Sequence, residues 1–223
     1  MKNTAIHNAI DIIVQNKKGN YINKACKVCL HMSKSAMVEF GKELVRNALK
    51  DTGGDVYHFN PAGTGLGIDI RFGVIVHPES VEPIIIDDIE PVIDTSLQEK
   101  LISNAKSFVS KNTTDEKQKM LEDNIILFQV CDLEGRDIGK DCQYVIIYLQ
   151  KYSKIALGME LIRLAHNFEK GKEIDIMPAS KGNGAQQSMG IFLTPDSCEL
   201  IIKCTTFGPI DQYLEEYKQK HNK

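Results

Sequence analysis

Apolar residues recur at helical spacing in two stretches of the chain, and each stretch is followed by short apolar runs that are typical of strands. The helical positions are Met37, Phe40, Leu44, Val45 and Ala48 in the first stretch, and Ile155, Met159, Ile162 and Ala165 in the second. Ser35 and Ser153 stand where a helix N-cap is expected, and Gly54 and Gly171 stand where a helix terminator is expected. The pattern therefore predicts two helices of the same kind.

The two stretches belong to a longer repeat. A shift of 117 residues aligns 41–87 with 158–204 without a gap, and 16 of the 47 pairs are identical. Ordinary composition predicts about three identities by chance in such a window. The identical positions are Gly41, Glu43, Leu44, Arg46, Ala48, Gly54, Pro61, Ala62, Gly65, Gly67, Gly73, Pro78, Ser80, Glu82, Ile84 and Ile85, each with its partner 117 residues later.

Each copy predicts the order helix, strand, glycine-rich loop, strand, turn, strand. The first strands are expected at 56–60 and 173–177, and the segments IDIRFGVIVH and QQSMGIFLT at 68–77 and 186–194 read as central strands. HPES and TPDS place Pro at the second position of a tight turn. The fold class is thus α+β, with two tandem copies that we expect to be related by a pseudo-twofold axis.

The flanks of the repeat are less regular. We expect helices at 4–15, 96–109 and 210–219, strands at 21–32 and 142–149, and a polar connection at 111–124. The first half is then 1–110, with its core unit at 41–87. The second half is 111–223, with its core unit at 158–204. Fusion of the two halves into one globular domain is the alternative.

Composition narrows the classes of function. The formal net charge of −3 disfavours a nucleic-acid binder, and no apolar run is long enough for a membrane span. Six scattered cysteines without a secretory signal predict reduced thiols in a cytoplasmic protein. Cys26 and Cys29, followed by His31, have half the spacing of a zinc site, but no second ligand pair follows, so we expect no metal and no cofactor.

Two glycine-rich loops have the glycine density of a phosphate cradle. They contain Gly65 and Gly67 in the first copy and Gly182 and Gly184 in the second, without the Lys-Ser/Thr of a Walker A loop. Glycines that supply positive φ angles between strands are the simpler explanation. Likewise, the repeated pairs Glu43/Arg46 and Glu160/Arg163 favour helix stabilisation over catalysis.

The strongest charge feature is a run of acids in 79–99 that contains no Lys or Arg. A solvated surface is one interpretation, and a docking face for a basic partner is the other. The candidate partner-binding residues are Glu79, Glu82, Asp87, Asp88, Glu90 and Asp94.

The helix-plus-hairpin pattern SxxAMVEFGKELVRNA…IRFGVIVHPESVEPIII resembles small bacterial immunity proteins of polymorphic and contact-dependent toxin systems. The resemblance covers the two 47-residue units. It implies a non-catalytic protein that neutralises a toxin, plausibly a basic nuclease domain, by binding it. The alternative is a small-molecule or phosphate-ester enzyme that uses a glycine loop with His58 or His77 as acid or base.

Overall fold

The structure, a computed structural model, describes residues 9–50, 54–64, 70–87, 103, 124–178 and 191–221. Its fold is α+β. The helices are α1 (Lys34–Leu49), α3 (Lys151–His166) and α4 (Ile210–His221). The strands are β1 (Ala9–Asn16), β2 (Cys26–Met32), β3 (Val56–His58), β4 (Ile70–Arg71), β5 (Val74–Val76), β6 (Glu82–Asp87), β7 (Ile125–Asp132), β8 (Cys142–Leu149), β9 (Glu173–Ile176), β10 (Phe192–Leu193) and β11 (Glu199–Cys204).

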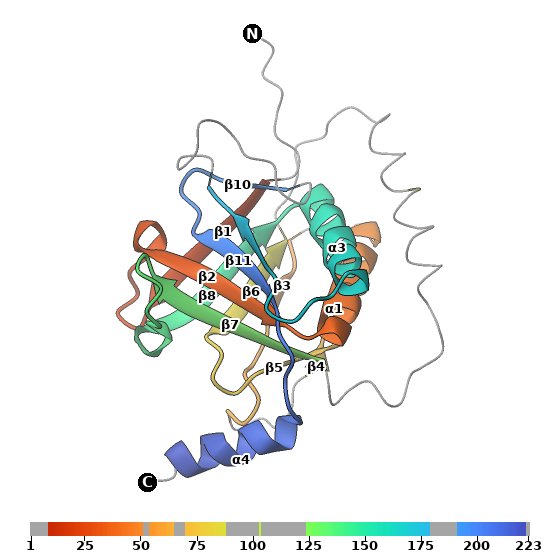
Figure 1. The fold of residues 1–223 in the computed structure, drawn as a ribbon. Coiled ribbons are helices and arrows are strands. Elements are labelled where there is room, and N and C mark those ends of the chain that lie inside the picture. The colour runs from red at the N-terminus through yellow and green to blue at the C-terminus, as the bar shows by residue number, and fades with distance from the viewer. Residues whose placement is uncertain are drawn as a thin grey trace.

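Within the described residues the strands form two mixed sheets. Sheet A has the order β10-β1-β8-β6-β3, and sheet B has the order β4-β5-β7-β2-β11-β9. Each sheet combines strands from both halves of the chain: β1, β3 and β6 of the first half lie in sheet A beside β8 and β10 of the second. Neither half therefore builds a sheet alone. Helices α1 and α3 lie side by side against the sheets, whereas α4 lies apart from them, below β7 and β5 in the view (Figure 1).

The pairing registers of the two sheets correspond position by position. In sheet A, β6 runs parallel to β8, with Glu82 opposite Tyr144 and Asp87 opposite Leu149. In sheet B, β11 runs parallel to β2, with Glu199 opposite Lys27 and Cys204 opposite Met32. Adding or subtracting 117 converts each pair of the first set into a pair of the second. The central antiparallel pairs, β1 with β8 and β7 with β2, correspond in the same way once β1 is shifted by 116.

The core lies between the inner faces of the two sheets and the buried stripes of α1 and α3. Alternate residues of β1 and β8, such as Ile12 and Ile147, pack in one cluster with Leu30 and Phe128 of sheet B and with Leu44 of α1. This alternation follows from the period of two residues in a strand.

The predicted helix at 4–15 is wrong where the structure describes it, because residues 9–16 form β1. Ile10, Ile12 and Val14 are buried while the residues between them are half-buried, which is the alternation of a strand. The β-branched side chains of this segment also favour extended backbone.

The segment at 68–77 is not one central strand. Its described residues form a hairpin of β4 and β5 that reverses at Phe72 and Gly73, whose φ angles are +50° and +69°. Of the strand expected at 186–194, the structure describes residues 191–194. The strand β10 begins there at Phe192.

The helix boundaries also differ from those expected. Ser33, not Ser35, caps α1, since its Oγ accepts a hydrogen bond from the Ala36 N–H. Gln150 precedes α3, and the Ser153 hydroxyl lies inside the first turn.

Gly54 and Gly171 do not terminate the helices, which end at Leu49 and His166. Instead both have positive φ angles at the entry to an edge strand, and their N–H groups donate to the carbonyl oxygens of Asp87 and Cys204. The strands at 142–149, 56–58 and 173–176 and the C-terminal helix are confirmed. The predicted helix at 96–109 and the connection at 111–124 lie outside the described residues, apart from Ser103, which is helical, and Asn124.

Candidate binding site

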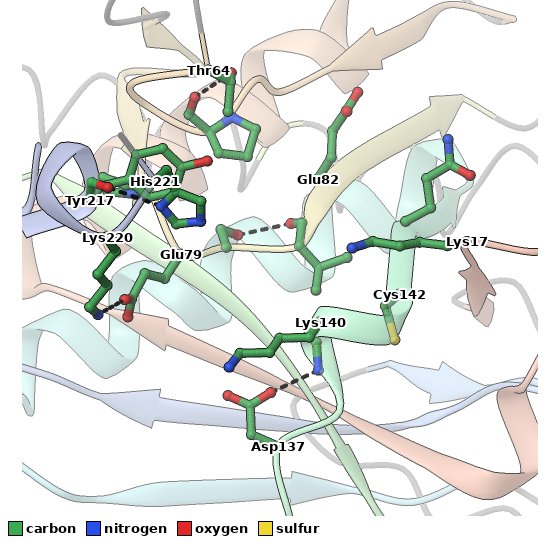
Figure 2. A pocket seen from close by; sticks show the side chains of 16 residues that line it. Lys17, Thr64, Glu79, Glu82, Asp137, Lys140, Cys142, Tyr217, Lys220 and His221 are labelled. Atoms are coloured by element: carbon green, nitrogen blue, oxygen red, sulfur yellow. Dashed lines mark hydrogen bonds and ion pairs between the residues drawn. The ribbon is translucent and has the colours of Figure 1, made fainter. Parts of the chain in front are cut away.

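A broad cavity of about 820 Å³ opens where the start of β6, the start of β8 and the end of α4 meet (Figure 2). Its described lining comes from five separated segments of the chain. The charged residues among them are Lys17, Glu79, Glu82, Asp137, Lys140, Lys220 and His221. Three carboxylates and three ammonium groups thus surround one space.

The 77–80 turn forms one wall of the cavity. The Ser80 N–H donates to the His77 carbonyl at 3.0 Å, which confirms the tight turn predicted for HPES. Ser80 Oγ donates to the Val81 carbonyl at 2.9 Å and accepts the Phe128 N–H at 3.0 Å, so the turn is fixed to β7. The corresponding turn at 194–197 closes in the same way, with a distance of 3.1 Å between Ser197 N and the Thr194 carbonyl oxygen.

Glu79 lies on this turn and forms an ion pair with Lys220 of α4. The hydrogen bond from Lys220 lowers the pKa of Glu79 from its ordinary value, against the opposing effect of partial burial. The pair attaches the C-terminal end of α4 to the rim of the cavity.

The opposite wall belongs to the second half of the chain. Asp137 accepts hydrogen bonds from the Gly139 N–H at 2.8 Å and from the Gln129 amide at 2.9 Å, which hold its carboxylate at the rim. Figure 2 shows the side chains of Lys17 and Lys140 extending into the space between the walls. Charged residues from both halves of the chain therefore line the same cavity. None of these second-half residues was predicted from the sequence.

Asp87 does not belong to an exposed acidic face. Its side chain is 1% exposed and pairs with Lys154 of α3 at 2.7 Å. Lys154 also donates to Asn47 Oδ1 at 2.8 Å. Burial raises the pKa of Asp87, and the hydrogen bond from Lys154 opposes that rise. The expectation that Asp87 meets a partner is wrong, because β6 ends beneath the two helices rather than at the surface.

The other acidic candidates divide into two groups. Glu79 is exposed and Glu82 is half-buried, and both line the cavity. Asp88, Glu90 and Asp94 lie outside the described residues, as do Gly65, Gly67, Gly182 and Gly184 of the two loops. The described beginning of the first loop, at Pro61 and Thr64, lines the cavity.

The two histidines of the alternative enzyme reading lie in different sheets. His58 is on the edge strand β3 of sheet A, where it pairs with Glu82 at 3.3 Å. His77 follows β5 of sheet B, is buried, and packs against Phe207 and Tyr213. Burial lowers its pKa. The two histidines therefore occupy separate positions in the fold, and a role of either as acid or base stays a prediction.

The pairs Glu43/Arg46 and Glu160/Arg163 form ion pairs within their helices, as their spacing predicts. Their side chains are at least 24% exposed, so they lie on partly solvated helix faces rather than in the core.

Cys26 and Cys29 cannot bind one metal ion together as they stand. Three residues apart on β2, they point to opposite faces of sheet B. Cys26 lies in the core with its Sγ 3.4 Å from that of Cys198, whereas Cys29 interacts with Cys131 on the other face. Among the described residues no group of three potential ligands could hold a metal ion.

Comparison with protein-family models, with curated proteins and with solved structures finds no match for this chain. In the described part of the chain, no helix combines the length and apolar character needed to cross a membrane.

Proposed function

We propose that this chain is a tandemly duplicated, non-catalytic binding protein that neutralises a bacterial toxin domain, as an immunity factor does. Its partner in this proposal is a protein domain with a basic surface, such as a nuclease. No nucleic acid, membrane or cofactor is required.

The duplication has two independent supports. The 16 identities between 41–87 and 158–204 are one, and they come from sequence alone. The other is the correspondence of strand order, because β10-β1-β8-β6-β3 becomes β5-β7-β2-β11-β9 when each strand is replaced by its counterpart in the other half. Two copies related by a pseudo-twofold axis, with exchanged strands, account for both supports. Such an exchange is the single-chain form of a swapped dimer.

The observation that carries the binding function is the cavity rim. Small-molecule sites are mostly apolar clefts with a few polar groups. This cavity also has apolar lining, but it carries six charged groups of both signs, contributed by both halves. Charges at a rim set the orientation and rate of protein association more than its affinity. The rim thus suits a partner protein, with Glu79, Glu82 and Asp137 facing its basic groups.

Co-expression tests the function directly. The probe is a toxin domain encoded beside the gene for this chain, produced with and without the wild-type protein. We expect the wild type to restore growth and to co-purify with the domain. Glu79→Lys/Glu82→Lys should slow association, and the difference should shrink as salt is raised because exposed charges are screened.

Glu134→Lys is the matched control. Glu134 is 67% exposed and lies outside the cavity, so its reversal changes the net charge without changing the rim. Glu134→Lys changes the net charge by two units and the double variant by four, so a loss of association rate in the same proportion would show that only net charge matters. A wild-type protein that neither restores growth nor binds the domain would contradict the function itself.

A further inference from the structure

Sheets A and B have corresponding backbones but different side chains on their outer faces, the faces that point away from the core. On sheet A the registers place Ile13 opposite Ile146 and Ile146 opposite Ile84, all absent from the core clusters. We define face A as this row together with its neighbours on β1, β8, β6 and β3. Its members are Asp11, Ile13, Gln15, Val56, His58, Glu82, Ile84, Ile86, Tyr144, Ile146 and Tyr148.

The corresponding face of sheet B carries two ion pairs between neighbouring strands. Lys27 pairs with Glu199 at 3.3 Å, and Lys203 pairs with Glu173. His31 hydrogen-bonds to Gln129 at 3.0 Å. A face whose charges pair with one another is suited to water.

Face A replaces these charged positions with apolar and aromatic ones. Tyr144 stands where sheet B has Lys27, Ile86 where it has Lys203, and Val56 where it has Glu173. Tyr144, Ile146, Tyr148 and Ile86 are half-buried and Val56 is 50% exposed, whereas Ile84 between them is buried. The same backbone thus carries a polar surface on one sheet and a largely apolar one on the other.

The charges that remain on sheet A have one sign. Its strands contain Asp11, Glu82 and Asp87 but no Lys or Arg. Asp87 is buried, so Asp11 and Glu82 are the charged groups of face A, with His58 beside Glu82. Glu82 also lines the charged cavity, which makes face A continuous with that rim.

We propose that face A is the docking surface of a folded partner domain that has apolar side chains at its centre and Lys or Arg around them. This inference rests on the proposed function and names its surface. Aromatic and large aliphatic residues at the middle of an interface supply most of the affinity. Asp11 and Glu82 meet the partner's cations at the edge, where complementary charge orients it.

The most direct test replaces two residues of face A with the residues that stand at the corresponding positions of sheet B. Tyr144→Lys/Ile86→Lys copies Lys27 and Lys203, and the new ammonium at position 144 lies opposite Glu82 as Lys27 lies opposite Glu199. We expect the urea midpoint to stay near that of the wild type. Affinity for the toxin domain encoded beside the gene should fall at least about tenfold, since central aromatic and aliphatic anchors are lost.

The reciprocal variant Lys27→Tyr/Lys203→Ile is the control and should bind the toxin domain as the wild type does. If Tyr144→Lys/Ile86→Lys also binds like the wild type, face A is not the docking surface, while the proposed function stands. If the wild type itself does not bind, the proposed function fails and the docking proposal falls with it.

Two further measurements do not need the toxin domain. Nile red, a neutral dye for apolar surfaces, should fluoresce less with Tyr144→Lys/Ile86→Lys than with the wild type, and equal fluorescence would overturn an accessible apolar face. Sedimentation should find the same mass for both proteins. A wild-type dimer that this variant abolishes would assign face A to a second copy of the chain and overturn the basic partner.

Discussion

Gly41 on α1 and Gly158 on α3 touch where the two helices cross: a Cβ on either glycine would lie 2.6 Å from the carbonyl oxygen of the other. The contact is reciprocal, and the two glycines are counterparts in the repeat. No side chain fits at this point without moving one helix away from the other.

Gly41→Ala and Gly158→Ala should therefore each destabilise the protein by about 1–3 kcal/mol, the usual cost of overpacking. The direction of the change in stability is informative, because alanine in a helix is otherwise about 1 kcal/mol more favourable than glycine. Urea unfolding followed by circular dichroism measures the change. Glu160→Ala, on a partly exposed position of α3, is the control and should change stability by less than about 0.5 kcal/mol. Stabilisation by Gly41→Ala would contradict the close helix contact.

The buried pair of Asp87 and Lys154 has no charged counterpart in the repeat. The corresponding residues are Cys204 and Met37, both buried. Lys154→Met should cost about 3–5 kcal/mol in the free energy of unfolding, because it leaves the Asp87 carboxylate buried without its cation.

Asp87→Cys/Lys154→Met copies the counterpart pair and should recover most of that loss, since replacing both ions removes both desolvation penalties. Urea unfolding of the two single variants and the double variant measures the coupling. Purely additive losses would contradict a direct interaction between the two side chains.

The repeat made much of this fold predictable. Strands β6 and β11, the two Ser-closed turns and the C-terminal parts of α1 and α3, from Gly41 and Gly158 on, lie inside the 47 aligned pairs, where each copy supports the assignment of the other. The exchange of strands between sheets was not predictable, because strand identity does not specify the neighbour with which a strand pairs.

The first strand was missed for a specific reason. Residues before β2 correspond to residues of the second half at a shift of 116 rather than 117. A comparison at 117 alone therefore does not align β1 with β7. At 116, Ile10, Val14 and Gly19 align with the identical residues Ile126, Val130 and Gly135. This signal was available and would have identified β1 as the counterpart of β7.

Beyond the aligned units, a shift of 117 also matches Ile93, Asp94, Leu97 and Glu99 with Ile210, Asp211, Leu214 and Glu216.

The candidate site was only partly predictable. Glu79 and Glu82 belong to a visible acidic run, whereas Asp137, Lys140 and Lys220 reach the same cavity only through the tertiary fold. Asp87 was misassigned because its partner, Lys154, is distant in the sequence and has an apolar counterpart. A run of charged residues in the sequence does not show which of them form buried ion pairs and which lie on a docking surface.

His77 should make stability depend on pH. Burial lowers its pKa from the ordinary value of 6.5, against the opposing effects of Glu79 and Glu216. The unfolded chain therefore binds the proton more tightly than the folded protein, and stability that is complete above about pH 6.5 is lost as the pH falls.

His77→Asn removes this titration while its side-chain oxygen can still accept the Glu79 N–H that His77 Nδ1 accepts at 3.2 Å. The free energy of unfolding, measured in urea between pH 5 and pH 8, should fall less steeply on acidification in the variant. His31 is also buried enough to have a lowered pKa, so some slope should remain. An unchanged slope in His77→Asn would contradict a neutral, buried His77.

The cysteines should react slowly in the folded protein, because each is at least partly buried. Cys26 and Cys198 are fully buried beside one another, and burial raises the pKa of Cys29 to about 12. The thiolate, which is the reactive form, is then scarce at pH 8. We expect intact-mass measurements with N-ethylmaleimide at pH 8 to show little labelling within minutes and six adducts in urea. Peptide mapping should find Cys29 modified first, because it is the least buried of the six. Elemental analysis in a reducing buffer should find no stoichiometric zinc, since Cys26 and Cys29 point to opposite faces of β2. Rapid labelling of Cys26 or Cys198, or one zinc per chain that Cys26→Ser and Cys29→Ser each release, would contradict this arrangement.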